Sequence, residues 1–194
     1  ARTPERWEQL QDQIVEGLLA WHRHDSGGCV GMVDSTQENL WPHWYRQRVE
    51  MLWSTLNLYH DTGLTMQDKR ILFRSRESLP QLFSDFNDNC VLVHGCFTLR
   101  SMLKDARSDQ LLAMVGPGMM LWAPREYELF RLADGGLGEQ LLWRYLQRAP
   151  VAESFVWRRW LYQLWDEVEN LVNTGRFDRA RFSLAAKSIL PWIA

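Results

Sequence analysis

Residues 91–103, VLVHGCFTLRSML, decide which fold the chain adopts and which chemistry it can support. A short apolar run, residues 91–93, leads into His94-Gly95-Cys96, and Ser101 follows five residues after Cys96. Valine-rich runs that end at a glycine are typical of a short buried strand followed by a loop. The stretch therefore predicts either an ordinary strand and turn, or a catalytic loop whose acid has been replaced.

The composition sets limits on the function. The chain has 194 residues, of which 46% are hydrophobic and 24% charged, as in an ordinary soluble globular protein. A net charge of -2 argues against nucleic acid bound over the whole surface. The three cysteines, Cys29, Cys90 and Cys96, form no CxxC pair and indicate reduced thiols and a cytoplasmic location. We find neither a membrane-spanning run nor a signal peptide, so no membrane partner is expected.

Hydrophobic spacing predicts an α+β fold that is predominantly helical and forms a single domain, 1–194. Thr3-Pro4 is a helix start, and Thr65 with Asp68 forms a capping box. The predicted elements fall into three blocks: helices over 4–86, a small β patch at about 91–115, and helices over 125–190. The loop sequence HDSGGCVG follows the first helix, and most of the 11 Trp lie in amphipathic patterns that favour a helical core.

The spacing of His94, Cys96 and Ser101 matches a known catalytic loop. Protein kinases use H-R-D-x-x-x-x-N, in which the Asp accepts the substrate proton and the Asn helps to hold the metal. With H-G in place of H-R, the stretch resembles the loop of the aminoglycoside phosphotransferase and choline kinase-like family, within the protein-kinase-like superfamily. The resemblance implies the fold of a kinase C-terminal lobe, here with the N-terminal lobe absent, because no Gly-rich strand-turn precedes Thr3.

Two further landmarks support the resemblance. The family's next strand ends in Ile-Asp, whose Asp binds metal, and here the strand LLAMV is followed by Gly116. Glu128-Leu129 stands where the family has Asp-Leu, and the first helix ends LLAWH, similar to the family's Leu-x-x-Leu-His. The resemblance covers the chain from its first helix to about residue 132, and it implies a scaffold hydrogen bond for Glu128.

The departures from the family pattern concern the chemistry. Cys96 replaces the proton acceptor, Ser101 the metal-ligand Asn, and Gly116 the metal-binding Asp. Glycine has no side chain to coordinate Mg²⁺, and a thiol is a poor ligand for this hard ion. A thiol with an ordinary pKa of about 8.5 is also mostly protonated at neutral pH, so it is a poor base. We therefore expect no phosphate transfer, no catalytic residue and no metal site among His94, Cys96, Ser101 and Gly116.

Simpler structural roles are favoured for several other features. His94 is expected to be a buried, hydrogen-bonded residue, and Cys96 to fill the vacated acid site rather than act as a nucleophile. His22, His24, Asp25 and Cys29 are close in sequence, but their spacing fits no standard zinc site. Bases alternate with aromatics in HWYRQR, DKRILFRSR and WRRWLYQLW, and on helices this pattern places the aromatic side chains inward and Arg outward.

Three hypotheses about the function follow. The first is a pseudokinase, an inactive phosphotransferase-like domain that binds a protein or a small molecule and needs no cofactor. The alternative is the C-terminal half of an unorthodox ATP-dependent phosphotransferase, in which Asp105 or Glu126 rescues magnesium binding. The third is a nucleic-acid-associated helical module. We also expect a homo-oligomer to cover the apolar surface that a missing lobe leaves near the first helix and the strand at 91–93.

Overall fold

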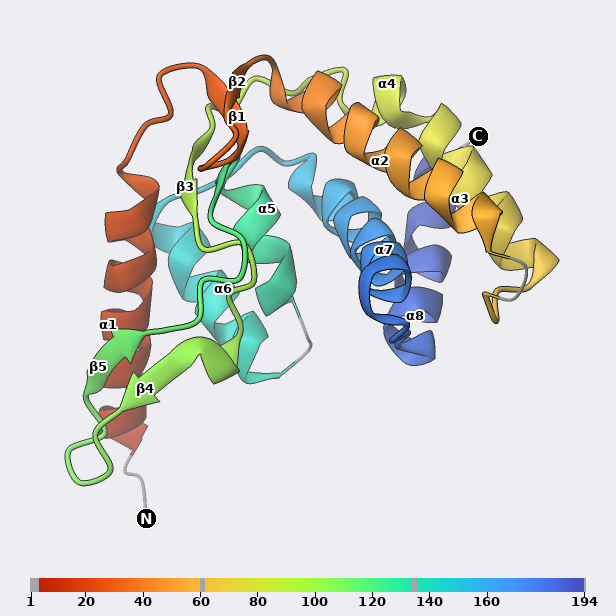
Figure 1. Cartoon of the computed structure of the whole chain (residues 1–194). Coiled ribbons are helices and arrows are strands. Elements are labelled where there is room, and N and C mark those ends of the chain that lie inside the picture. The colour runs from red at the N-terminus through yellow and green to blue at the C-terminus, as the bar shows by residue number, and fades with distance from the viewer. Residues whose placement is uncertain (1–3, 60–61, 134–135, 194) are drawn as a thin grey trace. The chain divides into compact units, whose positions relative to one another are not determined.

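A computed structural model describes residues 4–59, 62–133 and 136–193 (Figure 1). Where one domain was predicted, the chain divides into two compact units. The sheet unit comprises Ala1–Asn39 and Asp88–Val151, and the helical unit comprises Leu40–Asn87 and Ala152–Ala194. The residues of the kinase-like loop all fall in the sheet unit.

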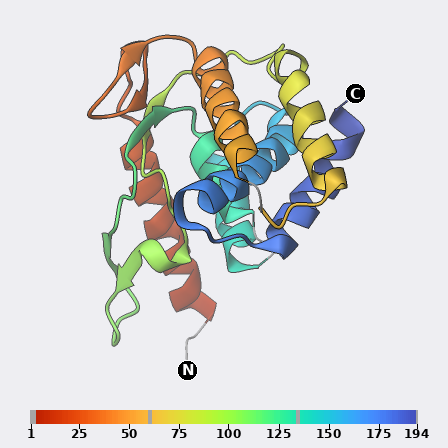
Figure 2. The ribbon, with the colours of Figure 1, turned by 45° about the vertical axis from the view of Figure 1, so that its right-hand side comes forward.

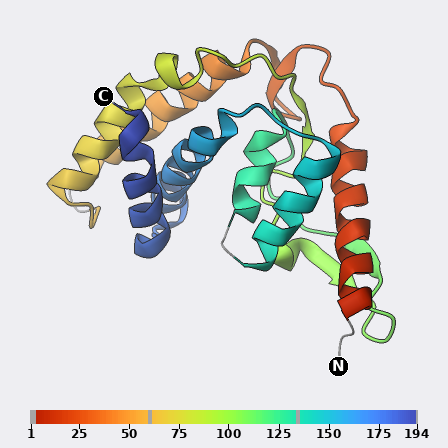
Figure 3. The ribbon, with the colours of Figure 1, turned by 180° about the vertical axis from the view of Figure 1, so that it is seen from behind.

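Two long helices form the frame of the sheet unit. Helix α1, Pro4–His22, buries a face of Leu10, Ile14, Val15 and Leu18, as the three-four spacing predicts. Helix α6, Leu137–Arg148, lies alongside it (Figure 3).

A four-stranded antiparallel sheet packs beside these helices. Its strand order is β2 (Gln37–Glu38), β1 (Cys29–Met32), β6 (Leu121–Ala123) and β3 (Val91–Val93). The prediction of one β patch at about 91–115 is corrected here, because β3 pairs with β6 and β6 pairs in turn with β1, and both of these strands lie outside that range. Neither strand was predicted: β1 overlaps the loop sequence HDSGGCVG, and β6 lies between the predicted β patch and the helices that follow it. Each is only three or four residues long, too short for a periodic pattern.

The remaining strands form a separate hairpin. β4 (Met102–Lys104) pairs with β5 (Leu111–Met114), and the 3₁₀ turn η1 (Leu99–Ser101) precedes β4. Leu103 and Leu112 are exposed on this hairpin, whereas Val91 and Val93 of β3 are buried. Leu92, which lies between these two valines, is partly exposed, and cover of this surface by a second copy stays a prediction.

Three short elements complete the sheet unit and the route to α6. The chain leaves β6 into α5 (Glu126–Leu129) and the 3₁₀ turn η2 (Phe130–Leu132), which are buried except at Arg131. Because these elements are buried, residues 125–132 carry many apolar side chains, at the three-four spacing that is typical of a helix.

The helical unit is built from helices (Figure 2), and its core is rich in buried aromatic side chains. Its elements are α2 (Trp41–Leu58), α3 (Met66–Glu77), α4 (Leu79–Leu82), α7 (Phe155–Thr174), α8 (Arg179–Ile189) and the 3₁₀ turn η3 (Leu190–Trp192). The predicted capping box at Thr65 and Asp68 is formed. The indole of Trp41 donates to Tyr162 at 3.2 Å, and that of Trp165 donates to Ser75 at 3.1 Å.

Arg158 corrects the prediction that arginines in WRRWLYQLW point outward. Its guanidinium is buried, donates to the Leu82 carbonyl and to Asp85 at 3.1 Å, and lies over the rings of Phe83 and Phe86. A guanidinium can be buried when a carboxylate and aromatic faces replace its water. In the part of the chain that is described, we find no helix with the length and apolarity to cross a bilayer.

Candidate functional site

Strand β3 delivers the kinase-like loop, residues 94–101, into the sheet unit. Its pairing with β6 sets Val93 opposite Leu121, so His94 begins the loop at the edge of the sheet. Gly95 has φ +82°, and a Cβ there would lie 1.9 Å from the carbonyl oxygen of Met119. The loop therefore packs so closely on residues 116–119 that only glycine fits at position 95.

The side chain of Glu128 holds the backbone of this loop by hydrogen bonds. Its carboxylate accepts hydrogen bonds from the backbone N–H groups of His94, of Gly95 at 3.4 Å and of Phe97 at 3.2 Å. Glu128 is fully buried, and burial raises the pKa of its carboxyl group, although Arg131 and the three amides favour the charged form. The carboxylate thus fixes the loop backbone. Among the described residues, it forms no hydrogen bond to the side chains of His94, Cys96 or Ser101.

His94 occupies a buried place with a defined tautomer. Its Nε2 donates to the Val115 carbonyl at 3.1 Å, because a carbonyl can only accept. Nδ1 then carries the lone pair and faces Cys96 Sγ at 4.0 Å. The ring packs against Trp21 and Phe97, and burial lowers the pKa of His94, so the imidazole is neutral.

Cys96 connects the loop to the segment after β5. Its thiol donates to the Gly116 carbonyl at 3.3 Å, and Sγ accepts from the N–H of Gly118 at 3.1 Å. A Cβ at Gly118 would lie 2.6 Å from Sγ, so the sulfur fills the space beside that glycine. Cys96 is half-buried, and its contacts are those of a packing residue with two backbone partners.

The hydroxyl of Ser101 is used inside the loop. It accepts from the N–H of Thr98 at 3.2 Å and donates to the Cys96 carbonyl at 3.4 Å. Thr98 in turn accepts from the N–H of Arg100, which completes a capping arrangement around η1. Ser101 is buried, so its oxygen is oriented toward the backbone of the loop.

Gly116 leaves an open space where the family has its metal-binding acid. It is exposed and has φ +66°, and a Cβ there would meet no atom within 4 Å. The adjacent Val115 N–H donates to the Ser101 carbonyl at 2.8 Å, so the segment is held beside the loop. The residues at the three positions, Cys96, Ser101 and Gly116, therefore do not fit a hydrated Mg²⁺ ion, which prefers carboxylate oxygens.

The two carboxylates considered as substitutes have other roles. Asp105 lies in the turn between β4 and β5, where it accepts from the N–H groups of Arg107 at 2.9 Å and Ser108 at 2.7 Å. These hydrogen bonds lower the pKa of Asp105. Glu126 is buried in α5.

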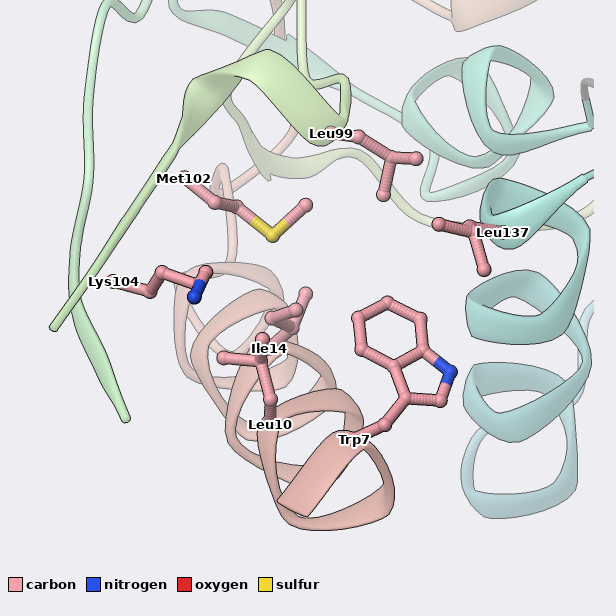
Figure 4. A pocket seen from close by; sticks show the side chains of 7 residues that line it. All are labelled: Trp7, Leu10, Ile14, Leu99, Met102, Lys104 and Leu137. Atoms are coloured by element: carbon pink, nitrogen blue, oxygen red, sulfur yellow. The ribbon is translucent and has the colours of Figure 1, made fainter. Parts of the chain in front are cut away.

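An apolar pocket of about 250 Å³ borders the far end of the loop (Figure 4). Leu99 and Met102 line it from η1 and β4, and Trp7 faces them from α1. The Trp7 indole is held by a hydrogen bond to Gln140 at 3.2 Å. The remaining lining residues are Leu10, Ile14, Lys104 and Leu137.

Sequence reasoning missed a second, polar pocket of about 520 Å³ at the other end of β3. It brings His22 together with Tyr145, whose hydroxyl is 2.6 Å from His22 Nδ1. His22 was considered only beside His24, Asp25 and Cys29, and no group of three potential metal ligands occurs among the described residues. The 123-residue separation of His22 and Tyr145 leaves no local signal that could have paired them.

The chain was compared with known proteins. It is 78% identical over all 194 residues to the uncharacterized protein YcbJ of Escherichia coli K12 and spans 65% of that relative's length. A crystal structure described as a fructosamine-3-kinase of Thermobifida fusca matches with a TM-score of 0.72 at 19% identity, over 98% of this chain and 67% of that one. The gentamicin–APH(2")-IIa complex matches with a TM-score of 0.62 at 15% identity, over 97% and 64%.

No protein-family model matches the chain. At identities below 20%, the structural matches establish the fold rather than an activity. The resemblance read from the sequence is thereby confirmed at the level of the fold, which the chain shares with structures described as a fructosamine-3-kinase and as a gentamicin–APH(2")-IIa complex.

Proposed function

We propose that this chain is a pseudokinase domain, which retains the phosphotransferase fold but acts by binding a protein or a small molecule. The observation that carries the proposal is the state of the three positions on which the family's chemistry depends. Cys96 bonds to backbone groups of residues 116 and 118, the Ser101 hydroxyl is used within the loop, and Gly116 has no side chain. No carboxylate stands at the proton-acceptor or metal positions.

The arrangement supports binding in two ways. Glu128 and Gly95 hold the loop in a fixed backbone conformation without any catalytic side chain. Beside the loop, the pocket around Trp7 and Leu99 offers apolar surface and one cation, Lys104, which is paired with Asp109. Pockets of this kind accept small ligands with an apolar body.

A thermal-unfolding titration with ATP, with and without Mg²⁺, tests the proposal. A ligand at ten times its Kd stabilises the folded state by about 1.4 kcal/mol. We expect no magnesium-dependent rise in Tm with ATP beyond the effect of magnesium alone. A saturable magnesium-dependent rise would contradict the proposal and favour the alternative, an unorthodox phosphotransferase.

A restored variant provides the positive comparison. Cys96→Asp, Ser101→Asn and Gly116→Asp together return the family's pattern, and the open space at position 116 can accept the new side chain. Asp tolerates a positive φ better than most residues. The matched control is Gly175→Asp, because Gly175 has φ +69° and an equally open Cβ position in the helical unit. We expect the restored variant to gain magnesium-dependent stabilisation that the control lacks.

A further inference from the structure

The polar pocket at the start of β3 differs in character from the pocket beside the loop. It lies where the end of α1, the start of β3 and the end of α6 meet. Eight of its ten lining side chains are polar or charged: His22, Arg23, Asp25, Asp88, Asn89, Arg125, Tyr145 and Arg148. Among these, three guanidinium groups face two carboxylates, so the lining carries one more positive than negative charge.

These charged groups differ in the hydrogen-bond and ion-pair partners that they have within the protein. Arg125 donates to the Pro150 carbonyl at 3.1 Å and lies 3.8 Å from Asp88, so both serve the fold. Arg148 pairs with Glu16, but both side chains are more than 40% exposed. Exposed pairs contribute little to stability and exchange partners readily. Arg23 is exposed and forms no ion pair among the described residues.

A chain of hydrogen bonds sets the proton position on His22. Arg125 can only donate, and it bonds to the hydroxyl of Tyr145. The hydroxyl proton is then directed to His22 Nδ1 at 2.6 Å. Burial and, secondarily, Arg125 lower the pKa of His22 to about 3, so the imidazole is neutral and its proton is on Nε2.

The Nε2–H group of His22 has no hydrogen-bond acceptor among the described residues, although the side chain is only 7% exposed. A buried donor without an acceptor costs about 1–3 kcal/mol. Such a donor is therefore a reason to look for a partner that the protein chain does not supply.

From these observations we propose that the pocket binds the oxyanion group of a small molecule, a carboxylate or a phosphate. Arg23 supplies the free charge, Arg148 can leave Glu16 to supply a second, and His22 Nε2–H donates to the anion. An oxyanion satisfies the buried donor and balances the excess positive charge. This site is independent of the degenerate loop, since it involves neither Cys96 nor Gly116.

Calorimetric titration with sodium phosphate and, separately, sodium citrate tests the proposal, with sodium chloride keeping the ionic strength constant. We expect saturable one-to-one binding of at least one of the two anions. Arg23→Gln should weaken it at least ten-fold. Arg144→Gln is the matched control, because Arg144 lies on α6 like the lining residue Arg148 but pairs with Asp12 outside the pocket. A response to phosphate alone assigns a phosphate group, and a response to citrate alone assigns a carboxylate.

Proton NMR of the histidine ring gives a readout that a purely structural role would not move. We expect the His22 ring resonances to shift on saturation with the anion and its pKa to rise, because a bound negative charge favours the imidazolium. No saturable binding of either anion, or binding that is equal in wild type and Arg23→Gln, would overturn the proposal. An unmoved His22 resonance at saturation would also overturn it, because the buried donor would then have another partner.

Discussion

The inner side of the kinase-like loop, which faces Glu128, and its outer side, where Cys96 and Gly116 lie, differ in their contacts. On the inner side, Glu128 accepts hydrogen bonds from three backbone N–H groups of the loop, and Gly95 permits close contact with Met119. On the outer side, neither Cys96 nor Gly116 carries a carboxylate. The thiol of Cys96 donates a hydrogen bond to the backbone carbonyl of Gly116. The comparison shows that the residues that hold the loop backbone differ from the residues at the positions of the family's chemistry. The backbone conformation depends on buried contacts, whereas a reaction depends on a few side chains.

The largest effect is expected on the supporting side, at Gly95. Gly95→Ala places a Cβ 1.9 Å from a backbone carbonyl and forces a residue with a side chain to φ +82°. The conformation alone costs about 1–2 kcal/mol, and the backbone shift should bring the loss of unfolding free energy above about 3 kcal/mol. Urea denaturation measures it. A loss below about 1 kcal/mol would show that the loop is not closely packed.

Removal of the Glu128 carboxylate should cost about 3 kcal/mol in unfolding free energy. Glu128→Ala leaves three backbone N–H groups, two of them belonging to buried His94 and Phe97, without an acceptor. Glu128→Gln keeps one acceptor oxygen and should lose about half as much in the same denaturation assay. Equal losses for both variants would contradict an anchoring role through hydrogen bonds.

A pH scan of the unfolding free energy tests the polar pocket around His22, at the start of β3, separately from the loop. His22 has its pKa lowered from 6.5 to about 3, so the unfolded chain binds the extra proton between those values. The contribution of neutral His22 is complete above pH 6.5 and is lost as the pH falls toward 3. Between pH 7 and 5 we expect a loss of about 2 kcal/mol in the wild type that His22→Gln lacks. Identical pH profiles for the two proteins would refute the assignment.

The smallest effect is expected on the outer side of the loop, at Cys96. Cys96→Ala removes one thiol with two backbone partners from a half-buried place. We expect less than about 1 kcal/mol change in unfolding free energy, since the sulfur can be replaced in part by water. Matched denaturation of Cys96→Ala and Gly95→Ala places the two sides on one scale. A larger loss for Cys96→Ala would reverse the comparison.

Local patterns predicted most of the helices, because α1, α2, α6 and α8 bury faces with three-four spacing and Thr65 caps α3. The strands β1 and β6 were missed because their stability comes from pairing partners about 90 residues away, and Gly31 in β1 reads as a loop residue. The membership of the two compact units could not be read from local patterns, since each unit joins two segments that are separate in the sequence.

The candidate site was partly predictable. The resemblance to the phosphotransferase family grouped His94, Cys96, Ser101, Gly116 and Glu128 as one constellation, and the structure places them around one loop. The bonds of Cys96 to residues 116 and 118 could not be predicted, because they arise from the packing of two loops some 20 residues apart. The polar pocket at His22 depends on Tyr145 in another helix and has no sequence signature.

The most direct test of the account asks whether a divalent cation binds at the loop. Amide NMR spectra of the protein with ATP and Mn²⁺, a paramagnetic substitute for Mg²⁺, report a bound ion as selective broadening of nearby resonances. We predict no selective broadening of the amides of residues 94–101 and 115–118. Broadening confined to these amides and reversed by excess Mg²⁺ would contradict the account.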